Sequence, residues 1–517
     1  MLSSVAKSGE AGSSLGKCLR RAPFVLIVLV SLGVIGASVF KMTRQTLASS
    51  PIDIWEASTI GVAAQVAQGQ PMYARMNEPD GMEPGLYSPL QPFTLAAIFR
   101  VTGPNLVAGR LINLLSGLAF ILIFIRALEL HRNFVLLLFG LALLFALDRQ
   151  LSGLWDLPRA DAVPLLCSLL YLCASFRACT QNSMSWALLG HVALLLGLLW
   201  KQTIVAVAAA PFLATIVTPA VPRRIKWVFF IGPPILGAAT ALVIAWLSPN
   251  LYDAMFRGLA KYSISLRVMA LYGYGLLLST PLIWMTFWWL LFSPDSKIIE
   301  SAKMRWALAA AVAAIPMNFL AAAKTGGGQN SFAHMLYALG AVILLCAPGF
   351  FNYLRTESLP VLKRCVFGTA LSVALIVEWA TVVWTPSRYK THRPAGDSGR
   401  ATVVSFARSL PGKVVSPQDP TIALLAKGYA GVSAANEYDR RTWRWPLPKV
   451  IREMEQADYV ITWGKTNTWQ TFTFDEGFQM LPQLGFEPMP VPGLENSDYQ
   501  VWKQKVPKPS TLPQNKP

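Results

Sequence analysis

The chain has 517 residues, of which 54% are hydrophobic and only 14% are charged, and its mean hydropathy is +0.44. Because soluble globular proteins carry about 25% charged residues, this composition excludes an ordinary soluble domain and indicates a membrane protein. The net charge of +18 does not indicate a nucleic-acid partner, since the basic residues lie in short loops between apolar runs, as topology signals and contacts with anionic lipids do.

Eleven apolar segments are candidate transmembrane helices, and most approach the ~20 residues that a bilayer core requires. They are residues 22–40, 106–125, 134–147, 161–176, 186–200, 203–218, 227–247, 273–292, 306–323, 335–351 and 365–385. The first follows basic residues but has no small-residue cleavage site, so we expect a retained anchor. Lys and Arg concentrate in the N-terminal segment and in every second loop, which predicts a cytoplasmic N-terminus. The chain after residue 385 is then extracytoplasmic.

The first outer loop, residues 41–105, contains two acids, Asp53 and Glu56. Acids three residues apart lie on one face of a helix, and at a lipid–water boundary such a pair can take a proton from a hydroxyl. Trp55, between them, would hold the acids near the lipid headgroups. The alternative is that Asp53 follows a Ser-Pro pair as part of an ordinary helix start.

Further ionisable residues lie near the outer ends of the next spans. Arg110 is four residues into the second span, where a charge faces the protein interior or snorkels to the headgroups. Arg159 and Asp161 close the second outer loop, either as a local ion pair and helix cap or with Asp161 in the same outer cavity as Asp53. Lys201 joins the fifth and sixth spans, and its compact ammonium suits either a substrate phosphate or bulk lipid phosphates.

Two later outer loops also carry polar groups. The segment 248–272 reads as an amphipathic interfacial helix, with Arg257 and Lys261 four residues apart as a phosphate clamp or as plain lipid contacts. A Gly-rich segment precedes Gln329 and Asn330, and its glycines allow either close backbone approach to a ligand or a flexible hairpin turn. It is not a nucleotide P-loop, because it lacks the GK[ST] ending and a preceding strand.

Residues 386–506 change character, and short strand-like runs alternate with helical ones, which predicts a small α/β domain. The predicted strands are 413–416, 458–462 and 499–503, and the predicted helices are 420–427, 447–456 and 475–484. We expect residues 1–385 to form the membrane domain and the proline-rich tail 507–517 to be disordered.

The polar groups gather at one surface, while the spans are apolar through their middles. A transporter spreads its polar groups toward the bilayer midplane and often breaks helices there. The pattern therefore favours an enzyme that works on a lipid-borne substrate. A membrane scaffold whose outer domain binds a partner is a further alternative.

The motifs, taken in order, resemble the GT-C superfamily of integral-membrane glycosyltransferases, which use polyprenyl-phosphate sugars. They are most similar to bacterial members near the protein-mannosyltransferase and aminoarabinose-transferase-like families. Besides the first-loop acids, the matching pieces are Gly69-Gln70-Pro71-Met72-Tyr73, Tyr87-Ser88-Pro89-Leu90, Gly109-Arg110-Leu111, Arg159-Ala160-Asp161, Lys201-Gln202-Thr203 and Gly328-Gln329-Asn330. The resemblance covers most of residues 22–385 and implies a polytopic α-helical protein of the bacterial inner membrane, with about eleven spans and a small extracytoplasmic domain.

The resemblance implies an inverting sugar transfer to a glycan, lipid or protein of the cell envelope. Asp53, supported by Glu56, would deprotonate the acceptor hydroxyl. In the commoner form of the motif the two acids are adjacent, so which of them is the base stays open here. Cations would stabilise the departing lipid phosphate, with Lys201 as the first choice.

The other implied roles are less specific. The residues that would help to bind the donor phosphate are Arg110, Arg257 and Lys261, and those that would position acceptor or substrate are Arg159, Asp161, Tyr87, Gln329 and Asn330. A divalent cation, where one is used, would bind Asp53 and Asp161. The alternative function is a lipid-linked-sugar transporter or flippase without transferase activity.

Overall fold

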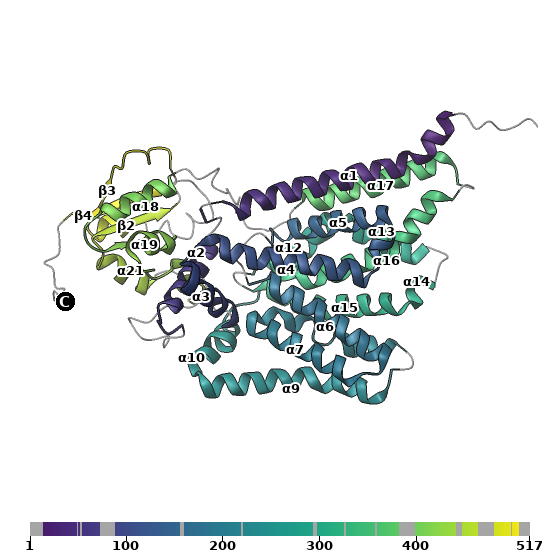
Figure 1. The fold of residues 1–517 in the computed structure, drawn as a ribbon, viewed down its shortest axis with the longest axis horizontal. Coiled ribbons are helices and arrows are strands. Elements are labelled where there is room, and N and C mark those ends of the chain that lie inside the picture. The colour runs from purple at the N-terminus through teal and green to yellow at the C-terminus, as the bar shows by residue number, and fades with distance from the viewer. Residues whose placement is uncertain are drawn as a thin grey trace, which may run out of the picture.

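The computed structural model describes residues 14–48, 50–51, 54–72, 88–155, 160–218, 221–292, 297–324, 327–356, 359–381, 399–440, 447–463, 480–497 and 499–505. Long helices lie side by side in a bundle, and a small α/β unit sits at one end of it (Figure 1). We call the bundle end that carries this unit the proximal end and the opposite one the distal end. At the proximal end α1 (Ser14–Thr46) ends and α4 (Leu106–Ala127) begins.

The bundle is built from the apolar segments that the sequence predicts as spans. Besides α1 and α4, its helices are α5 (Phe134–Gln150), α6 (Ala162–Gln181), α7 (Met184–Trp200), α8 (Ala210–Val217), α9 (Arg223–Leu247), α12 (Leu266–Ser279), α13 (Pro281–Phe292), α15 (Ala302–Ala323), α16 (Ala333–Arg355) and α17 (Val361–Ala380). In the described part of the chain six helices are long and apolar enough to cross a membrane, or seven if a bent pair counts as one span. The chain is thus a helical membrane protein, and eleven spans stays a prediction.

The core of the bundle is aromatic and tightly packed around Trp155, which is fully buried. Trp155 lies against α4, where a Cβ on Gly117 would come within 2.5 Å of its Cγ. It also stacks on Tyr337 of α16, with ring centroids 5.9 Å apart. A glycine at this position of α4 therefore makes room for the largest side chain of the core.

The predicted span 273–292 is not one continuous helix, because α12 and α13 bend by 75° at the residue before Pro281. Proline has no N–H to continue the α12 ladder, and side chains of other helices satisfy the freed groups. Glu378 Oε2 accepts the backbone N–H of Leu282 at 3.2 Å, and Gln150 Nε2 donates to the last carbonyl of α12 at 2.5 Å. Glu378 and Gln150 stand at the proximal ends of α17 and α5, so the break lies near that end and not at the midplane.

The α/β unit follows the bundle. Its elements are α18 (Arg400–Ser409), β1 (Val414–Val415), α19 (Pro420–Lys427), α20 (Ala434–Arg440), α21 (Pro448–Glu455), β2 (Tyr459–Trp463), β3 (Phe486–Met489) and β4 (Tyr499–Gln504). The sheet order is β1-β2-β4-β3, with β1 parallel to β2 and the other pairs antiparallel. The predicted tail 507–517 and the first half of the predicted helix 475–484 fall outside the described residues, and residues 480–483 are helical.

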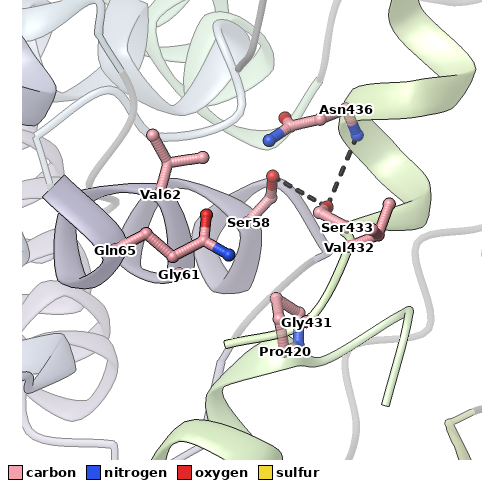
Figure 2. A pocket seen from close by; sticks show the side chains of 9 residues that line it. All are labelled: Ser58, Gly61, Val62, Gln65, Pro420, Gly431, Val432, Ser433 and Asn436. Carbon is pink, nitrogen blue, oxygen red and sulfur yellow. Dashed lines mark hydrogen bonds between the residues drawn. The ribbon is translucent and has the colours of Figure 1, made fainter. Parts of the chain in front are cut away.

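Helices α2 (Ile54–Ala67) and α3 (Leu90–Thr102) lie between the bundle and the α/β unit (Figure 1). Ile54 is fully buried in the core of the unit. Gln65 Nε2 donates to the carbonyl of Ala430 at 2.5 Å, and the hydroxyls of Ser433 and Ser58 are 2.9 Å apart (Figure 2). The seam between α2 and the unit encloses a cavity of about 20 Å³, which has room for about one water molecule. This cavity is too small for a substrate, so the contact between α2 and the unit is structural.

Candidate functional site

Arg110 is fully buried and is surrounded by acceptors from the first outer loop. Its Nε lies 2.6 Å from Oε1 of Glu56, which is also fully buried. Its Nη2 donates to the carbonyl of Ser50 at 2.8 Å, and its Nη1 donates to the carbonyl of Ala48. Arg110 therefore ties the end of α1 and the start of α2 to α4. Asp53 lies between these two anchored segments in the sequence.

A second buried ion pair joins Lys201 and Asp161. Lys201 Nζ lies 2.6 Å from Asp161 Oδ1, and the two side chains are 9% and 5% exposed. Asn330 Nδ2 donates to the other carboxylate oxygen at 3.2 Å. The residues come from the start of α6, the end of α7 and the short helix η4 (Gln329–Phe332). The fold thus brings three sequence-predicted residues together at the proximal end.

The surroundings of this pair bear on two of the alternatives for its residues, the helix cap for Asp161 and the bulk-lipid contact for Lys201. Asp161 occupies the N-cap position of α6, but its side chain makes no capping hydrogen bond, because it is directed to Lys201 and Asn330. The helix-cap interpretation of Asp161 is therefore wrong. Lys201 is buried beside an anionic partner, so it is not a surface lysine at a hairpin tip in contact with bulk lipid.

His334 belongs to the same region, and sequence reasoning missed it. It lies in the first turn of α16, is 5% exposed, and interacts electrostatically with both Asp161 and Lys201. Its Nε2 has no hydrogen-bond partner among the described residues. The available signal was its spacing four residues after Asn330, which places both on one helical face. The apolar pattern of the span hid it.

The second outer loop is held in a fixed turn next to Gln329. Ser152 Oγ donates to Gln329 Oε1, and Asp148 Oδ1 accepts the N–H of Leu154 at 2.7 Å. Ser152 has φ of 68° and the following Gly153 has φ of 76°, which makes the chain reverse sharply after α5. In the structure Gln329 therefore holds a loop.

Arg257 and Lys261 have exposed side chains. Arg257 lies in a π-helical turn, η3 (Asp253–Arg257), and its Nη1 is 3.1 Å from Oδ1 of Asp253 in the preceding turn. Arg257 is 70% exposed. The turn is tied to the Lys201 region by Gln202, whose Nε2 donates to the carbonyl of Met255 at 3.3 Å. The two cations are therefore surface residues, and the turn that carries Arg257 is joined to the residue that follows Lys201.

Asp53, Tyr87 and Arg159 lie outside the described residues, and their roles stay predictions. Ser88, directly after Tyr87, is buried, and its Oγ donates to the carbonyl of Leu198 in the last turn of α7 at 2.8 Å. The described residues contain no group of three or more His, Cys, Asp or Glu side chains that could hold a metal ion. Asp161, the other predicted ligand, directs both oxygens to protein donors.

No protein-family model matches the chain, and no curated protein sequence matches it. Solved structures do resemble it in fold, and two of them are structures of ArnT. ArnT from Cupriavidus metallidurans in the apo state is 14% identical with a TM-score of 0.51, over 92% of this chain and 97% of that one. ArnT from the same organism bound to undecaprenyl phosphate is 13% identical with a TM-score of 0.52, over 93% and 98%. The chain therefore has the fold of ArnT, an aminoarabinose transferase of the GT-C type, which confirms the sequence resemblance at the level of the fold.

Proposed function

We propose that this protein is a glycosyltransferase of the inner membrane. It transfers a sugar from a polyprenyl-phosphate donor to a hydroxyl of a cell-envelope acceptor at the extracytoplasmic face, with inversion. The fold shared with ArnT supports this, since one ArnT structure contains undecaprenyl phosphate. The observation that carries the proposal is the buried Lys201–Asp161–Asn330 cluster at the bundle end next to the first outer loop.

Lys201 binds the donor phosphate in this proposal. An ammonium has three N–H donors, so Lys201 can keep its bond to Asp161 and also donate to phosphate oxygens. Burial makes these charge-assisted bonds stronger than in water. As the glycosidic bond to the phosphate breaks, the negative charge that develops on the phosphate meets a cation already held in place. Asp161 and Asn330 are positioning residues for Lys201.

The proton of the acceptor hydroxyl goes to Asp53. The acceptor oxygen attacks the anomeric carbon from the face opposite the phosphate, the carbon–oxygen bond to the phosphate breaks, and its electron pair leaves with the polyprenyl phosphate. Glu56 is paired with Arg110 at 2.6 Å, which favours Asp53 as the base. Glu56 and Arg110 then hold the segment that carries Asp53, and Arg110 does not contact the donor.

The test uses the purified full chain in liposomes with a panel of polyprenyl-phosphate sugars and cell-envelope extract, and mass spectrometry of the products. We expect a new glycosidic product, a loss of at least ~100-fold in Asp53→Asn and in Lys201→Gln, and normal transfer in Arg355→Gln at the distal end. Transfer that persists in both Asp53→Asn and Glu56→Gln contradicts the mechanism. Movement of the lipid-linked sugar across the bilayer without any product would identify a flippase.

A further inference from the structure

The bundle contains a large apolar cavity of about 1020 Å³ between α4, α6, α7, α15 and α16. Its walls are mostly aliphatic and aromatic, as Phe124, Leu169, Leu189 and Ala341 illustrate. Pockets for small molecules measure roughly 300–1,000 Å³, so this cavity has room for a large apolar ligand. It extends from His334 in the first turn of α16 to the distal ends of α4 and α6.

Four cations line the distal edge of this cavity: Arg126 at the end of α4, Arg132 in the short helix η1 (Leu130–Arg132), Arg177 near the end of α6, and Lys303 at the start of α15. The only acid among the described lining residues is Glu129. It is shared, with its carboxylate oxygens 2.5 Å from Arg132 and 2.7 Å from Lys303. The distal edge is therefore strongly cationic.

The other two arginines have neutral neighbours. Arg126 Nη1 lies 2.9 Å from Nε2 of His131. The Arg177 guanidinium lies over the ring of Trp186, 4.7 Å from its centroid. Since neither contact neutralises the guanidinium charge, the distal edge of the apolar cavity carries a net positive charge. That combination matches an amphipathic anion, with its charge at the edge and its chains inside.

We propose that this cavity binds an anionic phospholipid from the leaflet at the distal end, which is the cytoplasmic leaflet in the predicted orientation. The phosphate contacts Arg126 and Arg177, and the acyl chains fill the cavity. Cationic clusters at a membrane surface attract anionic headgroups, whereas a zwitterionic lipid also brings a quaternary ammonium group that offsets the charge of its phosphate. The polyprenyl donor is a poorer match for the distal cations, because its phosphate belongs at Lys201, beside His334 at the proximal end of the cavity.

Native mass spectrometry of the full chain tests this directly. The protein is supplied with phosphatidylglycerol or phosphatidylcholine that carry identical acyl chains. We expect the wild type to retain phosphatidylglycerol preferentially, and Arg126→Gln/Arg177→Gln to reduce that preference roughly tenfold or more. The matched control, Arg224→Gln/Arg355→Gln, removes two cations from the same end of the bundle outside the cavity lining and should keep the preference.

A second variant tests the cavity itself. Ala338→Trp places a large side chain among the lining residues and should lower the retention of both lipids without changing the preference between them. An unchanged preference in Arg126→Gln/Arg177→Gln, or an equal loss in the control pair, overturns the proposal. So does undecaprenyl phosphate that displaces phosphatidylglycerol equally well from the wild type and from the double variant, because the cavity would then hold a polyprenyl chain.

Discussion

Two buried ion pairs at the proximal end share one chemistry and differ in their surroundings. Glu56–Arg110 is enclosed by backbone carbonyls of the first outer loop, to which Arg110 donates with both Nη atoms. Lys201–Asp161 is accompanied by an amide and by an imidazole nitrogen that has no hydrogen-bond partner in the described part of the chain. The first environment suits a structural ion pair, and the second suits the donor-phosphate site that we propose.

Glu56→Gln should destabilise the protein by about 3 kcal/mol, because it leaves the buried Arg110 guanidinium without its counter-charge. Asp53→Asn should leave the unfolding temperature close to that of the wild type while it removes transfer. Thermal unfolding in detergent, beside the transfer assay, separates the two effects. A Glu56→Gln variant with normal stability and no transfer would make Glu56 the base instead.

The Lys201–Asp161 pair should show non-additive effects on stability. Either Lys201→Gln or Asp161→Asn leaves one buried charge unpaired and costs about 3 kcal/mol or more, whereas the double variant removes both charges and regains much of that loss. Transfer should stay low in the double variant, because no cation remains for the phosphate. Unfolding temperature and transfer rate, measured on the three variants, check this. Recovery of transfer in the double variant would show that Lys201 does not act on the donor.

At the scale of elements, close packing depends on single glycines. Gly117→Ala should destabilise the bundle by about 1–3 kcal/mol, since a Cβ would come within 2.5 Å of Trp155 Cγ. Gly36→Ala in α1 is the matched control, because a Cβ there meets nothing within 4 Å and alanine favours the helix. Thermal unfolding compares them, and equal effects would mean that Trp155 can repack.

The sequence predicts the elements better than their breaks and contacts. The helices of the bundle follow from long apolar runs, and β2 and β4 from short β-branched and aromatic ones. The break before Pro281 was hidden, because the apolar run continues across it and the stabilising carboxylate, Glu378, comes from another helix. Short β3 was missed as well, since Glu487 and Pro488 interrupt its apolar pattern.

The candidate site shows the same limit. The distribution of Lys and Arg over alternate loops places Asp161, Lys201 and Asn330 on the same side of the membrane, since each stands at the end of an apolar run. Their mutual contacts could not be predicted, because they depend on how three separate helix ends meet. The pairing of Glu56 with Arg110 was missed for the same reason. Each residue could be explained by its local sequence, such as a helix start or snorkelling to the headgroups, and nothing in that sequence indicates a partner in another helix.

At the scale of the whole molecule, the seam joins the first outer loop to the α/β unit and should respond to pH. Glu453 Oε2 accepts the N–H of Val432 at 2.7 Å, next to Ser433 in the seam. Burial raises the pKa of Glu453 above its ordinary 4.5. A buried Glu453 is more easily accommodated in the folded protein when it is protonated. Its contribution to the free energy of unfolding is therefore fully present below the unfolded-state pKa and is lost as pH rises through the folded-state pKa.

We expect Glu453→Gln to flatten this dependence. The amide oxygen can still accept from Val432, but it carries no charge that must be desolvated. The fall in unfolding temperature between about pH 5 and about pH 8 should be smaller in the variant than in the wild type. Glu455→Gln, on the exposed side of the same helix, is the control. If the unfolding temperature of the wild type does not fall over this pH range, the ionisation of Glu453 does not control the stability of the seam.

Helix α2 has a consequence for how this protein can be recombined with its relatives. One side of α2 contributes Ile54 to the core of the C-terminal unit, and another contributes Glu56 to the pair with Arg110. In a chimera that exchanges only residues 399–505, the core of the new C-terminal unit would pack against the Ile54 of the host instead of the residue of its own α2. The smallest segment that can be exchanged as a unit therefore also includes α2. Its residue at position 56 must be able to pair with Arg110 of the host. The start of α2 in the first outer loop and the C-terminal unit are thus inherited together.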